Sequence, residues 1–383
     1  MNELAINLMR LRKLNGLTQQ AVAEAAGISR VAYRNLEKGD AAPRESTLQA
    51  LAAALRCSVM DLLTPVPQLK SLRFRANKQM SEQERAQSDL LVAHSANWLN
   101  DFNELEDLLG ENRENRLKPV RKGTAPEKAA QIAREQLLGE KSNCDCMPDL
   151  CELLENANIK LFLFDFKLTN LFGLSIGDKD GGPAIAIHTG KNISVERQIF
   201  SLAHELGHLL MHKDSYGKNS EELTDEQEAE ADRFAAAFLM PREQFIAEWK
   251  ENRGLHWVDA VLKTKRHFKV SYQAVLRQLI EMGKAEHPTV YKKFRADYQE
   301  RYGKKLEWNE EPPATPVPQA SLPARPADEP RRLDPLDLME DRLATLVRDA
   351  LDKELITVSR AAEILDVSIE EIRGRMKSWE VVK

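Results

Sequence analysis

The chain has 383 residues, of which 42% are hydrophobic and 30% charged, so it is long enough for two or three domains with buried cores. A net charge of −5 excludes a protein that is basic over its whole surface, so any DNA-binding face must be local. The four cysteines, the lack of a long apolar run and the lack of a signal-peptide pattern exclude a secreted disulfide framework and predict a cytoplasmic protein without a membrane span.

Residues 1–64 show a compact helical pattern in which two short helices meet at a tight turn. Thr18 and Ser29 are suitable N-caps for these two helices, and Gly27 stands in the turn between them, where a positive φ is common. The pattern is carried by the run Leu-Thr-Gln-Gln-x-x-Ala-x-x-Ala-Gly-Ile-Ser-Arg-x-x-Tyr-x-x-Leu-Glu-Lys-Gly, which starts at Leu17. This run resembles the Xre helix-turn-helix family of phage-repressor type, which implies an all-α domain that binds a double-stranded DNA operator.

The third predicted helix of this domain has a polar face that is suited to reading bases. Arginine and asparagine can each make two hydrogen bonds to a guanine or adenine edge, and Val31 can meet a thymine methyl group. The resemblance also places Gln19 at a position that holds a phosphate. The predicted DNA-binding residues are Gln19, Ser29, Arg30, Val31, Arg34 and Asn35. One such domain binds DNA weakly, so we expect a homodimer; the alternative is a helix-turn-helix retained for protein interaction.

Residues 65–124 are predicted to connect this domain to the next one. Within them, the pattern over 69–110 is helical and highly charged, which favours an interdomain brace or a dimer contact. An amphipathic helix over 126–138 follows, and then the period changes to strand-like runs at 159–164, 171–176 and 183–188. These runs predict a small sheet, whose last strand could pair with an extended substrate backbone.

The run from Phe200 to His212 contains His-Glu-x-x-His on a predicted buried helix. His204 and His208 stand one turn apart on the same face, so two imidazoles can reach one metal ion. Glu205 stands beside them, where it can act on a water molecule at that ion. This spacing is typical of zinc hydrolases.

A second predicted helix opens with a capping box at Thr224 and stops at Pro241. Glu228 and Asp232 stand four residues apart on one side of it. A His-His-Glu zinc site needs a carboxylate from a second helix and an acceptor that orients a ligand histidine, and these two residues can fill the two roles. Glu230 is the alternative ligand, although its position turns it to the other side of the helix.

The motif A-H-E-L-G-H-L-L-M-H, followed by E-x-E-A-D-R-F-A-A-A-F-L-M-P, resembles the ImmA/IrrE family of zinc metallopeptidases. The likeness also covers Pro183 to Ile187 and the run from Phe268 to Arg277, and so spans about residues 125–282. It implies an α+β, minimal zincin-like domain that binds Zn²⁺. It further implies cleavage of helix-turn-helix repressors, which releases stress, DNA-damage or phage-defence genes.

The residues together predict a zinc endopeptidase in which His204, His208 and Glu228 bind Zn²⁺ and Glu205 is the general base. The expected substrate is a helix-turn-helix repressor, in trans or the chain itself, and a nucleic-acid or other damage signal is the expected activator. The donor to the oxyanion stays open among four residues, of which His212 is expected to be solvated: His212, Tyr216, His256 and Tyr272. The alternative functions are a non-proteolytic regulator with a sensory zinc fold and an antitoxin-like DNA-binding protein.

A latch on the site is expected, because a protease that is always active would be of no use to the cell. Thiolate is a better zinc ligand than water, so Cys144 or Cys146 could occupy the fourth metal position until a signal moves their loop. Cys151 is expected in the core, and the loop over 213–222 is the alternative latch.

The C-terminal part begins with a stretch rich in Pro, Ala and Glu over 309–335, which predicts an extended linker. Residues 336–383 then show three short helices, the last two with helix-turn-helix spacing, and either DNA or a partner protein could dock there. The whole chain is therefore predicted to be multidomain and mainly α. Its parts would be a helix-turn-helix domain (1–64), a connector (65–124), an α+β metallopeptidase domain (125–308), the linker and a small helical domain (336–383).

Overall fold

In the computed structural model, the chain forms two compact units, which are described separately. The first unit consists of Met1–Lys70, Ala76–Glu106 and Leu168–Asn170, and the second of Ser71–Arg75, Asp107–Lys167 and Leu171–Lys383. The structure describes residues 3–55, 57–63, 69, 72–73, 82–112, 115–144, 146–165, 172–190, 193–216, 224–287, 289–307, 310–312 and 338–381. None of the helices in these described parts is long and apolar enough to span a lipid bilayer.

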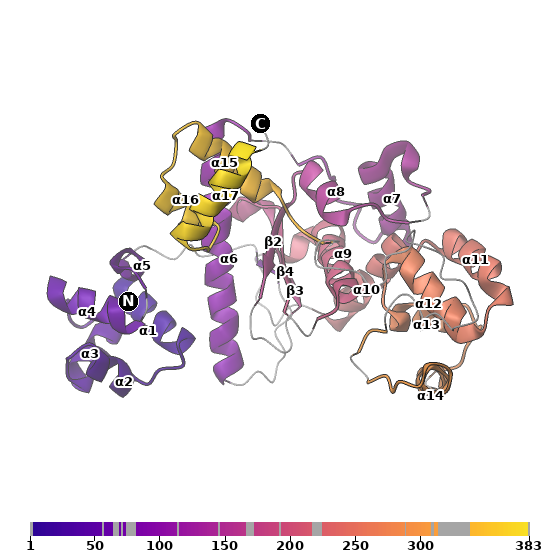
Figure 1. Ribbon diagram of the computed structural model, residues 1–383, viewed down its shortest axis with the longest axis horizontal. Helices are drawn as coiled ribbons and strands as arrows, with labels where there is room; N and C mark the ends of the chain where they lie inside the picture. Colours follow the sequence, from indigo (N-terminus) through magenta and orange to yellow (C-terminus); the bar gives the residue numbers. More distant parts are fainter. Residues whose placement is uncertain are drawn as a thin grey trace. The chain divides into compact units, whose positions relative to one another are not determined.

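The first unit begins with a helix-turn-helix domain (Figure 1). Its helices are α1 (Glu3–Leu14), α2 (Gln19–Ala25), α3 (Arg30–Lys38), α4 (Glu45–Leu55) and α5 (Val59–Leu63). Thr18 and Ser29 cap α2 and α3 through their side-chain oxygens, and Gly27 between them has a φ of 68°. Fully buried Val22 and Tyr33 belong to the core that holds the helices together. The predicted all-α domain is therefore confirmed.

The predicted connector contains one long helix, α6 (Glu82–Leu109), with an apolar buried face that includes Trp98 and Phe102. The prediction of a helix from residue 69 is wrong at its start, because Leu72 and Arg73 form strand β1 (Leu72–Arg73) of the second unit. A strand of two residues shows no periodicity in the sequence, and only its pairing with a distant strand creates it.

The second unit contains a four-stranded sheet with the order β1-β3-β4-β2. Its three longer strands are β2 (Lys160–Phe164), β3 (Gly173–Ile176) and β4 (Ala184–His188), which confirms the three predicted runs. β4 pairs in parallel with β2 and antiparallel with β3. The expectation that this last strand pairs with a substrate is wrong, because both of its edges are already hydrogen-bonded within the sheet.

Two helices bring the His-Glu-x-x-His motif and the second acidic motif together. Helix α9 (Val195–Met211) packs on β3 and β4, and α10 (Asp225–Leu239) packs on α9 and on α7 (Pro126–Leu138). The two helices approach closely at Gly207, where an added Cβ atom would lie 2.9 Å from the ring of Phe234. Leu202, Leu206 and Phe238 are fully buried between these elements and the sheet. The site therefore rests on a packed core.

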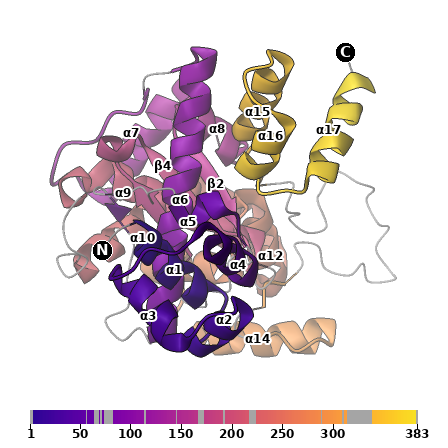
Figure 2. The ribbon, with the colours of Figure 1, turned by 90° about the vertical axis from the view of Figure 1, so that its left-hand side faces the viewer.

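Further helices complete the second unit (Figures 1 and 2). They are α8 (Leu150–Asn156), α11 (Arg242–Glu251), α12 (Trp257–Phe268), α13 (Tyr272–Glu281), α14 (Thr289–Tyr302), α15 (Arg342–Asp352), α16 (Val358–Ile364) and α17 (Ile369–Val381). The predicted linker lies outside the described residues except for 310–312. There the Glu311 carboxylate accepts the backbone N–H of Tyr272 and pairs with Lys265 at 2.8 Å, so these three residues pack on α12 and α13.

The C-terminal helices contact the rest of the second unit through the end of α8. The carboxylate of Glu155 accepts the backbone N–H groups of Asp341 and Arg342, at 3.5 and 3.3 Å. The guanidinium of Arg342 donates to the side-chain oxygen of Asn158 at 2.5 Å, and Leu338 is buried in the core. Polar contacts to α8 therefore tie this small domain to the second unit.

Candidate metal centre

The sequence places the site residues on α9 and α10 through local signals at the start of each helix. Ser194 caps α9 by accepting the N–H of Arg197, and Thr224 caps α10 by accepting the N–H of Gln227. These caps fix where each helix begins. One helical turn then puts His204 and His208 on the same face of α9, with ring centroids 4.7 Å apart.

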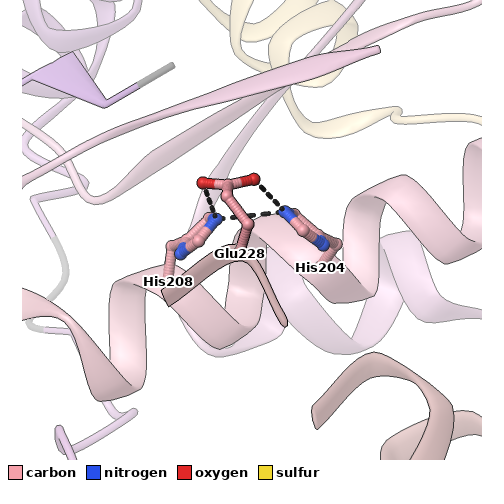
Figure 3. A group of neighbouring side chains, drawn as sticks. All are labelled: His204, His208 and Glu228. Atoms are coloured by element: carbon pink, nitrogen blue, oxygen red, sulfur yellow. Dashed lines mark hydrogen bonds and ion pairs between the residues drawn. The ribbon is translucent and has the colours of Figure 1, made fainter. Parts of the chain in front are cut away.

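His204, His208 and Glu228 converge on one point (Figure 3). The two Nε2 atoms lie 3.0 Å apart, and each lies 3.4 Å from an oxygen of Glu228. His208 is only 2% exposed, and the other two residues are half-buried. The structure therefore brings the three predicted ligands together.

This cluster fits a zinc ion by its donor atoms and by their spacing. Two imidazole nitrogens and one carboxylate form a donor set that zinc prefers, with one position left open. Ligand atoms about 2.0–2.1 Å from a tetrahedral zinc ion lie roughly 3.4 Å from one another. The two distances from the histidines to Glu228 match this value, and the two Nε2 atoms lie somewhat closer, at 3.0 Å. His204, His208 and Glu228 would hold the ion.

The charges in the cluster also favour a cation. Burial by itself lowers the pKa of His204, but hydrogen bonds to Asp232 and Glu228 and the nearby charge of Glu205 outweigh burial and raise this pKa to about 10. Burial by itself raises the pKa of Glu228, but hydrogen bonds and charges from the two histidines hold it well below its usual range. The metal-free site thus keeps a proton where an ion would bind, and an ion must displace that proton.

Asp232 and His212 lie behind the two histidines. The carboxylate of Asp232 is 2.9 Å from Nδ1 of His204 and 3.8 Å from the guanidinium of Arg277. The expectation that His212 is solvated is wrong, because His212 is only 6% exposed and its Nδ1 lies 2.9 Å from Nδ1 of His208. Its Nε2 lies 2.9 Å from the carboxylate of Glu230 on α10. Glu230 of helix α10 therefore helps to keep His212 from solvent.

Glu205 is buried, with 7% of its surface exposed, and a chain of hydroxyl groups reaches it. Ser175 on β3 donates to Oε2 of Glu205 at 2.7 Å, and the hydroxyl of Tyr216 donates to Ser175 at 2.8 Å. Sequence reasoning missed Ser175. The signal that could have found it is a lone hydroxyl in a strand whose residues are otherwise apolar or glycine.

The four candidates for the oxyanion donor lie in different places. Tyr216 is the one hydrogen-bonded into the chain that reaches Glu205. His212 contacts His208, His256 caps α12, and Tyr272 is buried and stacked on Phe294.

The structure places the cysteine pair apart from the histidines. Arg134 bridges the backbone oxygens of Cys144 and Phe238, and Phe238 lies about 15 Å along α10 from Glu228. Cys146 follows in the same loop, and Cys151 is buried in α8, where burial raises the pKa of its thiol. The close group of possible metal ligands contains neither Cys144 nor Cys146, and the latch stays a prediction. The alternative latch loop lies mostly outside the described residues.

Five of the six predicted DNA-binding residues lie on α3 or at its N-cap. Ser29, Arg30, Val31 and Arg34 are exposed, Val31 to 66%, and Asn35 is half-buried. Gln19 at the start of α2 is also half-buried. Its amide donates at 2.7 Å to Glu37, which pairs with Arg12 at 2.5 Å. Gln19 is thus fixed against α3.

These two parts define a class of protein, a DNA-binding regulator that carries a domain of metallopeptidase type. Residues 8–62 match the helix-turn-helix family, and residues 154–279 match the IrrE N-terminal-like domain, a family of peptidases. The chain therefore has an N-terminal helix-turn-helix domain and, after it, an IrrE-like domain. Its N-terminal part is 42% identical over 59 residues to the uncharacterized HTH-type transcriptional regulator y4dJ of Sinorhizobium fredii (strain NBRC 101917 / NGR234). That likeness covers 15% of this chain and 77% of the relative.

Proposed function

We propose that the protein is a zinc-dependent endopeptidase whose cleavage of a protein substrate is coupled to DNA binding. The observation that carries this proposal is the convergence of His204, His208 and Glu228 beside a buried Glu205. The match of residues 154–279 to a peptidase family supports it.

The chemistry is divided among residues of α9, α10 and β3. A zinc ion held by His204, His208 and Glu228 would polarise the scissile carbonyl group. Glu205 accepts the proton of the attacking water and returns it to the leaving amine. Asp232 accepts the Nδ1 proton of His204, so that Nε2 of this histidine faces the ligand position.

Two hydroxyl groups serve the same site. Ser175 holds one oxygen of Glu205 in place by donating to it. Tyr216 is the best-supported donor to the oxyanion, because only Ser175 separates its hydroxyl from Glu205; the proton that it donates to Ser175 would turn to the oxyanion instead.

The substrate that fits this pair of domains is a helix-turn-helix repressor, in trans or the chain itself. Binding of residues 8–62 to an operator would bring the peptidase domain to DNA on which repressors assemble. A homodimer would place two such domains on two half-sites. A signal such as damaged nucleic acid would then release the activity.

The test is an incubation of the purified full-length chain with helix-turn-helix regulators encoded beside its gene. We expect cleavage that requires zinc, stops with a chelator and falls at least 10²–10⁴-fold in Glu205→Gln, because general-base catalysis contributes about that much. Full activity of Glu205→Gln would remove the catalytic model. DNA binding without cleavage of any regulator or of the chain itself would favour the non-proteolytic regulator instead.

A further inference from the structure

His212 ends helix α9 one turn after His208, and its ring is held between two partners. Its Nδ1 atom lies 2.9 Å from Nδ1 of His208, and its Nε2 atom lies 2.9 Å from a carboxylate oxygen of Glu230. The side chain is buried, whereas that of Glu230 is 30% exposed. The three residues form a row that leads away from the metal cluster.

The protons in this row can be assigned from chemistry. A neutral imidazole carries one proton, and the nitrogen that binds a metal must be free of it. When Nε2 of His208 faces the ion, its proton therefore lies on Nδ1 and is donated to Nδ1 of His212. His212 then carries its own proton on Nε2 and donates it to Glu230. Each hydrogen bond has one proton in this arrangement. By accepting the Nε2 proton, Glu230 selects the tautomer of His212 whose Nδ1 can accept from His208.

The other ligand histidine has a shorter arrangement. Nδ1 of His204 donates directly to Asp232, with no residue between them. His208 is thus linked to the carboxylate of Glu230 through the imidazole of His212, while His204 is bonded directly to the carboxylate of Asp232. Partners of this kind orient a metal-binding imidazole and raise its basicity.

We propose that His212 and Glu230 are positioning residues that fix the tautomer and the orientation of His208 for metal binding. This inference rests on the metal centre of the proposed function, and it extends that centre by a residue pair beyond the three ligands. His212 is not itself a ligand in this geometry, because it contacts the nitrogen of His208 that faces away from the cluster.

The test measures Zn²⁺ affinity of the metal-free, full-length chain by competition with a chelator, and needs no substrate. We expect His212→Leu to weaken zinc binding by roughly 10–100-fold, the usual effect of losing such a partner. His212→Gln should retain most of the affinity, because its carbonyl oxygen can accept from His208 and its amide can donate to Glu230. Glu230→Ala should weaken binding by a smaller factor, since His212 remains but its tautomer is no longer selected.

Controls separate this role from a loss of structure. His287→Gln alters an exposed histidine outside the cluster and should bind zinc like the parent chain. The melting temperature of each metal-free variant reports the fold, and the Co²⁺ absorption spectrum reports ligand geometry. If His212→Leu fails to fold, Glu230→Ala tests the proposal instead, because the Glu230 side chain is half-exposed. Parent-like zinc affinity in Glu230→Ala then overturns the proposal.

The outcomes distinguish the inference from the function on which it rests. Parent-like affinity in His212→Leu overturns the positioning role, and so does a His212→Gln variant that is as weak as the leucine variant. A parent chain that binds no zinc overturns the metal centre, and the proposed endopeptidase with it. The expected result is weaker zinc binding in His212→Leu and nearly parent-like zinc binding in His212→Gln.

Discussion

Three acidic residues of α10, at alternate positions, meet different nitrogen atoms of the three histidines. Glu228 faces the Nε2 atoms of His204 and His208, Glu230 faces His212, and Asp232 faces Nδ1 of His204. All three residues have the same functional group, so their positions on the helix give them different roles. Glu228, which faces the converging Nε2 atoms of His204 and His208, can share a metal ion with them, whereas Asp232 and Glu230 lie where they can only orient a ring.

The assignment of Glu228 as the carboxylate ligand can be checked by metal analysis. We predict that Glu228→Gln loses most of its zinc, because a neutral amide oxygen is a poor replacement for a carboxylate ligand. Glu230→Gln should keep about one zinc per chain at saturating metal, because its amide oxygen can still accept from His212. Loss of zinc from the Glu230 variant alone would contradict the assignment.

Replacement of Tyr216 by Phe should lower kcat while KM changes little. Loss of one donor to an oxyanion costs about 10²–10³-fold in kcat, because the donor acts chiefly in the transition state. Ser175→Ala is the comparison variant, since it removes the hydroxyl between Tyr216 and Glu205. Equal, small losses in both variants would mean that Tyr216 only supports Ser175.

At the scale of the elements, the close approach of α9 and α10 decides whether the ligands meet. Gly207 stands between His204 and His208, and its missing side chain leaves room for the ring of Phe234. Glycine lowers helix propensity by about 1 kcal/mol relative to alanine, so local preference alone would disfavour it here. Packing between the helices outweighs that preference.

We predict that Gly207→Ala destabilises the protein by roughly 1–3 kcal/mol, because the added methyl group overpacks the contact with Phe234. Its zinc affinity should fall as well, since α10 carries Glu228. The matched control is Gly374→Ala on α17, where an added Cβ atom meets nothing within 4 Å, and which should be neutral or stabilising by up to about 1 kcal/mol. Thermal melting with and without zinc measures both changes, and a Gly207 variant as stable as the parent would contradict the packing argument.

The contact between α8 and the C-terminal helices should depend on pH. Burial raises the pKa of Glu155 to about 8, assisted by the charges of Asp341 and Glu340 and opposed by the backbone N–H groups of Asp341 and Arg342. A pKa raised on folding means that the folded state binds the extra proton. The stability from this contact is therefore full below the ordinary carboxyl pKa and is lost as pH rises through about 8.

We accordingly predict that the melting temperature of the parent falls between pH 6 and 9 by more than that of Glu155→Gln, which has no proton to lose. Glu152→Gln is the control, because Glu152 is exposed on the same helix. Parallel pH profiles for the parent and the Glu155 variant would show that this carboxyl group is ionised over the whole range.

At the scale of the molecule, the predicted DNA-binding residues and the candidate metal centre lie in separate units. The helix-turn-helix domain exposes Arg30 and Val31 on α3, while the metal centre lies between α9 and α10. Each part has its own core, so a substitution on one surface should leave the other part intact. Variants of each function can therefore be compared within the same chain.

Arg30→Ala should relax the preference for one base pair of the operator by about 1–3 kcal/mol, because a bidentate contact to a base edge is lost. Gln19→Ala should instead weaken binding to all sequences alike, since a phosphate contact carries no sequence information. Arg373→Ala, an exposed change on α17, is the control. Binding to promoter fragments at several salt concentrations tests these expectations, and unchanged preference in the Arg30 variant would contradict the assignment.

Much of the local structure around the site follows from the sequence alone. Ser194 and Thr224 start the two helices, and the spacing of His204 and His208 puts both on one face. The three longer strands follow from the change of period. These features depend on neighbours within about four residues, so the local sequence contains the information that specifies them.

Tertiary structure alone decided which partner each group meets. Ser175 is 30 positions from Glu205, and His212 is 18 from Glu230, and no sequence period links either pair. The strand order, with β4 between β2 and β3, likewise differs from the order along the chain. A buried polar group must find a hydrogen-bond partner, but the packing of α9 against β3 and α10 determines which one lies within reach.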